Sequence, residues 1–139
     1  MPLNDLTIDD VIDSFAFLDD WDERYRYLID LGRQLPDMDE AGRTDENKVR
    51  GCQSQVWLVP HMSDSGELMF DGDSDAHIVK GLVALILLIF SGKTPAAILA
   101  TDARAVLEQL DLKGHLSPMR ANGLFAMVER IGVIAKRYV

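Results

Sequence analysis

The stretch Val56–Phe70, VWLVPHMSDSGELMF, decides the fold that this sequence predicts. Its first run, VWLV, is short, β-branched and aromatic, which is typical of a β-strand. A turn signal, Asp64-Ser65-Gly66, follows, and a second apolar run, Leu68-Met69-Phe70, comes next. Two such runs joined by a glycine-containing turn predict an antiparallel hairpin. Val49 predicts a third, shorter strand ahead of the first run, with Gly51-Cys52 at the turn between neighbouring strands.

Helix signals flank this hairpin on both sides. Small polar residues that can cap a helix precede apolar residues at helical spacing or a proline at the first helical position. These starts are Thr7 with Asp10, Asp20 with Glu23, Ser74 or Asp75, Thr94-Pro95, the Asp102 region and Ser117-Pro118. The second helix should end near Pro36 and the third, from Ala76 to about Ser91, at Gly92. The polar, acidic stretch 37–48 predicts a solvated connection.

Length and apolar content indicate one globular domain. The chain has 139 residues, a common size for a single domain, so residues 1–139 are expected to form one unit. Its most apolar block, Gly81–Phe90, has ten residues, about half the length of a bilayer-spanning helix, and predicts a buried core helix instead. The N-terminal stretch MPLNDLTIDD is acidic and lacks the pattern of a signal peptide, so we expect a cytoplasmic protein.

The charge and the cysteine count narrow the possible partners. The formal net charge is −9, and an acidic surface repels phosphate backbones and anionic lipid. We therefore expect neither nucleic acid nor a membrane as a partner, and basic protein surfaces fit better. A chain with one cysteine forms no internal disulfide, which is consistent with a reducing compartment.

The single thiol, Cys52, lies in a polar, glycine-containing segment and is the strongest candidate for chemistry. A thiolate is a good nucleophile and a soft metal ligand. The backbone of the Gly51-Cys52-Gln53 turn, together with the charge of Lys48 or Arg50, would lower the pKa of the thiol, whereas burial among apolar side chains would raise it. Alternatively, Cys52 has no chemical role and is a small buried core residue, as unpaired cysteines often are.

Four segments of the chain resemble the SufE-like cysteine desulfurase activators, a family that includes SufE and CsdE. They are RGCQSQVWL (50–58), GDSDAHIVKGLVAL (72–85), KTP (93–95) and HLSPMRANGL (115–124). The resemblance runs from about Asp45 onward and is weaker in the N-terminal helices. It implies an α+β fold with a small three-stranded antiparallel sheet, helices packed mainly on one side, and the scaffold of the IscU/NifU cluster-assembly proteins.

The resemblance also implies a function. Cys52 would take persulfide sulfur from a SufS/CsdA-like cysteine desulfurase and pass it on for iron–sulfur cluster assembly, for instance to a SufB-type scaffold. The pyridoxal phosphate (PLP) would belong to the partner, and this chain would need no cofactor and act as a sulfur carrier rather than as a self-sufficient enzyme. We favour a gated form, in which the resting sulfur is buried and docking exposes it. Either a monomer or a homodimer is compatible with the sequence.

The matched segments supply further candidates for a lip around the cysteine loop and for a docking surface. These binding or gating residues are Gly51, Gln53, Gln55, Asp75, Lys80 and Arg120. Without the resemblance, Asp75 would be interpreted as a helix cap, and Lys80 and Arg120 as solvated charges. Arg120 in the first turn of a helix is unfavourable for the helix dipole, which is a weak indication of a partner carboxylate.

Other classes of function fit less well. His61, His77 and His115 lack the spacing of a zinc site, and one thiol is too few for an iron–sulfur cluster, so we expect no metal site. A cysteine hydrolase with His61 or His115 as base would lack a local peptidase signature around Cys52. The remaining alternative is a non-catalytic adaptor, which would activate a desulfurase by conformational binding without carrying sulfur.

Overall fold

The predicted hairpin forms the only sheet in the part of the chain that the structure describes. The structure is a computed structural model that describes residues 6–112 and 114–139; the first five residues of the acidic N-terminal stretch lie outside this range. Strand β1 (Val56–Met62) pairs antiparallel with β2 (Leu68–Ser74), in a register that runs from Val56 opposite Ser74 to Met62 opposite Leu68.

The expected third strand is not present in the described residues, because the sheet has two strands. Lys48 instead forms one isolated antiparallel bridge to Trp57, with the Val49 N–H donating to the Val56 carbonyl. Gly51, at φ 90°, then adopts a backbone conformation that favours glycine, in the loop that leads back to β1. The pairing therefore extends no further than a bridge, and the cysteine lies in a loop rather than in a tight strand turn.

Six α-helices and one short 3₁₀ turn accompany the hairpin in residues 6–112 and 114–139. They are α1 (Ile8–Phe17), α2 (Trp21–Arg33), η2 (Glu40–Gly42), α3 (His77–Phe90), α4 (Pro95–Ala100), α5 (Ala103–Gln109) and α6 (Pro118–Lys136). Side-chain caps occur at five of the predicted starts, namely Thr7, Asp20, Thr94, Asp102 and Ser117. None of the helices in the described ranges is both long and apolar enough to cross a membrane.

The predicted cap of α3 is wrong. Ala76 occupies the cap position and has no side chain that could cap the helix, while the predicted alternative, Ser74, accepts a 3.3 Å hydrogen bond from the Ala76 N–H just ahead of it. The Asp75 carboxylate instead accepts from the backbone N–H of Gln55, at 3.0 Å. The sequence could not show this, because the acceptor's partner lies 20 residues away along the chain. The apolar block still forms part of a buried helix, as predicted, since ten of the fourteen residues of α3 are buried.

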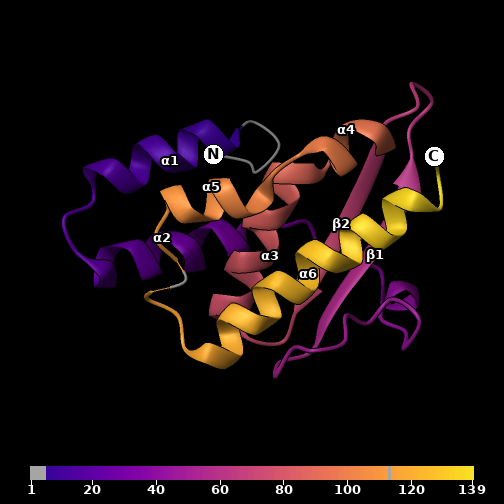
Figure 1. The fold of residues 1–139 in the computed structure, drawn as a ribbon. Coiled ribbons are helices and arrows are strands. Elements are labelled where there is room, and N and C mark those ends of the chain that lie inside the picture. Colours follow the sequence, from indigo (N-terminus) through magenta and orange to yellow (C-terminus); the bar gives the residue numbers. More distant parts are fainter. Residues whose placement is uncertain (1–5, 113) are drawn as a thin grey trace.

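Helix α3 is the centre of the fold. Figure 1 shows α1 and α2 at one end of the molecule, the hairpin at the other, and α3 between them, in contact with α2, β2 and α6. On the sheet, the side chains that face α3 are buried, among them Val56, Leu58, Leu68 and Phe70. The residues that alternate with them on β1 and β2 are mostly exposed or half-buried. Helices therefore cover one face of the sheet.

Two glycines allow α2 and α3 to approach to backbone contact. A Cβ on Gly32 would lie 2.6 Å from the amide nitrogen of Gly81, and a Cβ on Gly81 would overlap the carbonyl of Leu28. Real Cβ atoms do not tolerate such contacts. The position of α3, and of the site that it helps to form, thus depends on the absence of two side chains.

The acidic connection before the cysteine is anchored rather than fully solvated. The Arg43 guanidinium donates two hydrogen bonds to the buried carboxylate of Asp73, and the Lys80 ammonium lies 3.4 Å from the same carboxylate. Burial opposes the ionisation of Asp73, but hydrogen bonds from Arg43 and from the Ser74 N–H, together with the Lys80 charge, leave its pKa below the usual carboxyl value. This ion network therefore stabilises the fold at neutral pH, and its contribution is lost as the pH falls through that lowered pKa.

Candidate functional site

The loop that carries Cys52 lies along one face of α6. Cys52 contacts this helix at Gly123, where an added Cβ would lie 3.3 Å from Sγ, and an added Cβ on Gly51 would lie 3.3 Å from the Ala126 Cβ. Further along, Arg130 donates a 2.6 Å hydrogen bond to a carbonyl of the chain ahead of the loop, that of Glu46. Positions 123, 126 and 130 share one helical face. A single stripe of α6 thus contacts the loop at Gly51 and Cys52 and the chain ahead of it at Glu46.

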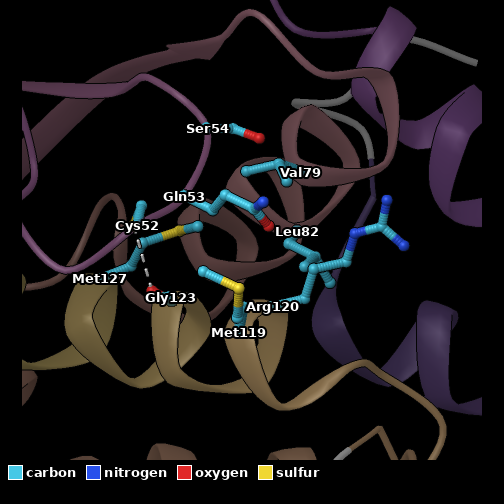
Figure 2. A pocket seen from close by; sticks show the side chains of 9 residues that line it. All are labelled: Cys52, Gln53, Ser54, Val79, Leu82, Met119, Arg120, Gly123 and Met127. Carbon is cyan, nitrogen blue, oxygen red and sulfur yellow. Dashed lines mark hydrogen bonds between the residues drawn. The ribbon is translucent and has the colours of Figure 1, made fainter.

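A small cavity of about 50 Å³ lies beside the cysteine, between α3 and α6 (Figure 2). Its lining consists of Cys52, Gln53, Ser54, Val79, Leu82, Met119, Arg120, Gly123 and Met127. The apolar side chains come from the two helices, and the polar ones mostly from the loop. A cavity of this size holds a water-sized group or a single additional heavy atom, but no small-molecule substrate.

The thiol itself is half-buried and has one weak hydrogen bond. Its Sγ donates to the Gly123 carbonyl at 3.5 Å, which is the dashed contact in Figure 2. Burial raises the pKa of Cys52 above its ordinary value, so the resting group is the neutral thiol at pH 7. Of the two effects that the sequence left open, partial burial determines the direction of the shift in the pKa of Cys52, and Lys48 and Arg50 do not offset it.

This environment predicts slow alkylation of the native thiol. We expect the rate of Cys52 modification by iodoacetamide to increase with pH through a midpoint above that of a free cysteine, because only the thiolate reacts and burial disfavours it. The same chain in denaturant, followed by intact mass, gives the reference midpoint. A native midpoint at or below this reference would contradict the buried resting state.

The structure brings some of the other predicted residues to the cavity and places others elsewhere. Gln53 and Arg120 line the cavity, and Figure 2 shows the Arg120 side chain extending away from Cys52. Gln55 lies at the far end of the loop, where its N–H is held by Asp75. Lys80 does not line the cavity and pairs with Asp73, so it is not the freely solvated charge of the simpler interpretation.

Several residues of the site were missed in the sequence. Gly123 lets the loop rest against α6, and Met119 and Met127 from the same helix close the cavity. A glycine inside a helical pattern is a signal for close packing, so Gly123 could have been found in the sequence. The two methionines had no such signal, because flexible apolar side chains fill gaps in any core.

The histidines do not form an alternative site. The ring of His115 stacks on Trp21 with 3.9 Å between centroids, and His61 lies 4.0 Å from the carboxylate of Asp71. Neither lines the cavity beside Cys52, whose hydrogen-bond partner is the Gly123 carbonyl. A cysteine hydrolase would require a base at the sulfur. Within residues 6–112 and 114–139, no group of three His, Cys, Asp or Glu side chains is arranged to hold a metal ion.

Comparisons with known proteins find a matching family model, similar sequences and a similar fold. A family model described as SufE, Fe-S metabolism associated domain, matches residues 9–135. An uncharacterized SufE-like protein of Rhizobium meliloti is 55% identical over 128 residues, which cover 90% of this chain and 91% of the relative. One from Rhizobium etli is 53% identical over 133 residues, with 94% and 90% covered. A solution structure of a hypothetical protein from Thermus thermophilus shares the fold, with a TM-score of 0.75, 18% identity and 94% of both chains covered.

Proposed function

This chain belongs to the SufE family, which is associated with iron–sulfur metabolism, and on that premise we propose that it activates a cysteine desulfurase by accepting persulfide sulfur on Cys52 and passing it on for cluster assembly. The observation that carries the proposal is the position of the single thiol. It lies half-buried in a glycine-containing loop, directly beside a cavity with space for about one more heavy atom.

The transfer needs only one acceptor thiol. The Cys52 thiolate attacks the terminal sulfur of the desulfurase persulfide, the sulfur–sulfur bond of the donor breaks, and the desulfurase cysteine leaves as a thiolate that takes up a proton. The new persulfide on Cys52 contains the transferred sulfur, and no external oxidant or reductant is consumed. The PLP chemistry that generates the sulfur belongs to the partner, so this chain needs no cofactor of its own.

The resting structure suits protection followed by release. The apolar side chains of Leu82 and Met127 line the cavity that would receive the terminal sulfur and shield it from reductants. Only a weak 3.5 Å hydrogen bond holds the thiol to α6, and Gly51 provides a flexible backbone position next to it. Docking of the desulfurase would exchange these contacts for its own and expose Cys52.

The other residues of the loop have supporting roles in this proposal. Asp75 holds the loop at Gln55, so it limits how far the loop opens. Gln53 and Arg120 form the lip of the cavity, and Lys80 is held near the start of α3 by Asp73. The downstream acceptor would be a SufB-type scaffold. The single domain over 1–139, the relation to the IscU/NifU scaffold and a homodimeric state are further expectations of the same proposal.

Mass spectrometry tests the proposal directly. After incubation with a SufS-like cysteine desulfurase, PLP and cysteine, the intact protein should gain the mass of one or more sulfur atoms, and a reductant should remove it. Peptide mapping should place the gain on Cys52. A matched incubation without cysteine should show no gain. An unchanged mass under conditions in which desulfurase activity is stimulated would favour the adaptor function instead.

A further inference from the structure

The segments that form the cysteine site differ in charge from the rest of the chain. The protein has 23 acidic and 14 basic residues. However, the segments 47–62 and 112–128, which contain the cysteine loop with β1 and the start of α6, have no Asp or Glu at all. Three of their four Lys and Arg residues are Lys48 and Arg50 in the loop and Arg120 at the cavity, and the fourth, Lys113, lies outside the described residues. An acidic protein thus presents its cysteine from a cationic region.

These three cations are not used inside the molecule. Among the described residues, none of them takes part in an ion pair, and the side chains of Arg50 and Arg120 are exposed. Two other basic residues, Arg43 and Lys80, are by contrast paired with Asp73. The chain therefore neutralises some of its cations with its own carboxylates and leaves those around the cysteine unpaired.

The carboxylates that do lie near this region are at its border. Asp75 is engaged with the Gln55 N–H, and Asp73, on β2 opposite Trp57, is paired with Arg43 and Lys80. The other nearby carboxylates are Asp71 on β2 and the residues that flank the acid-free segments in the sequence, among them Glu46, Asp111 and Glu129. Since the loop lies along α6, Arg120 is one turn before Gly123, the position that Cys52 contacts, and Arg50 lies two residues before Cys52 itself. The cations thus lie on the two elements that meet at Cys52, the loop and the start of α6, and the Arg120 side chain extends away from the sulfur.

We propose that this cationic face, formed by Lys48, Arg50 and Arg120, docks onto an acidic surface patch next to the persulfide-bearing cysteine of the desulfurase. The inference rests on the proposed function and specifies the chemistry of the partner surface. From the net charge alone we expected the partner surface to be basic, and for the cysteine face this inference replaces that expectation with an acidic partner surface. Because the whole chain has a net charge of −9 and these cations lie at the cysteine, an acidic patch would attract the cysteine face and repel the remaining surface, which orients the encounter. A discrete acidic patch suits such a molecule better than a long polyanion.

The test is a charge reversal in the loop, Lys48→Glu with Arg50→Glu. Binding of the variant to a SufS-like desulfurase is measured by calorimetry, and stimulation of alanine production gives the concentration for half-maximal effect. We expect both constants to weaken about tenfold or more at low salt, with the maximal stimulated rate little changed. For the wild type, binding should weaken as salt increases, and the gap to the variant should narrow as screening removes the repulsion.

A matched control is Lys136→Glu with Arg137→Glu, which makes the same change in charge at exposed positions at the end of α6. Any of three results would overturn the inference. The loop variant could bind the desulfurase as tightly as the wild type, the control could lose as much affinity as the loop variant, or wild-type binding could strengthen as salt increases. Salt-dependent binding without sulfur on Cys52 would overturn the proposed function and leave the charge inference standing. Sulfur transfer together with binding that does not depend on salt would overturn the charge inference and leave the proposed function standing. If the protein did not bind the desulfurase at all, both proposals would be overturned.

Discussion

Cys52→Ser is expected to reduce the stimulation of alanine production by a cysteine desulfurase to the level measured without this protein. Serine lacks a nucleophile that attacks a persulfide sulfur, and the chain has no second thiol to replace Cys52. The structural cost should be small, because the side chain is half-buried and makes only one weak hydrogen bond. The measurement is the rate of alanine release at saturating protein, together with the intact mass of the variant.

A matched control is Asn122→Ala, an exposed position on α6 next to Gly123 and outside the cavity lining. It should stimulate as the wild type does, and both variants should melt at the wild-type temperature. Full stimulation by a folded Cys52→Ser protein would reject sulfur acceptance and support the adaptor. Loss of stimulation together with retained binding would identify the sulfur, rather than docking, as the source of activation.

Gly81→Ala is expected to be the most destabilising single methyl addition among the helical glycines of the described chain. The added Cβ would overlap the backbone carbonyl of Leu28, and a carbonyl in the middle of α2 cannot rotate away as a flexible side chain would. Relief requires α2 and α3 to separate along the buried interface that contains Leu28 and Leu82. We expect a loss of about 2–3 kcal/mol in the free energy of unfolding, the upper part of the range for overpacked cores.

Gly132→Ala is the matched control, because it makes the same change in α6 and an added Cβ there meets no atom within 4 Å. Replacing a helical glycine by alanine in open space should stabilise by about 0.5–1 kcal/mol. Urea denaturation of both variants measures the difference. A neutral effect of Gly81→Ala would contradict the close approach of α2 and α3.

The local elements were predictable because their signals lie within a few residues of each other. A capping side chain such as Thr7, Asp20 or Ser117 acts on an amide three positions later, so the sequence contains both partners. The hairpin could also be predicted from the sequence, since its two apolar runs are joined by one short turn. The third strand was not, because a single residue such as Val49 cannot show whether a chain continues to pair or turns away after one bridge.

The sequence by itself identified the single thiol, in a short polar loop between a helical region and a hairpin, as the strongest candidate for chemistry, and the motif around it indicated the family. Only the tertiary structure decided the state of that thiol. Burial against Gly123 raises its pKa, and this contact joins residues 71 positions apart, a distance over which no periodicity or cap carries information. The same holds for Asp75 and Lys80, whose partners come from other segments. Packing of distant segments sets burial and charge, and burial and charge set the chemistry of the sulfur.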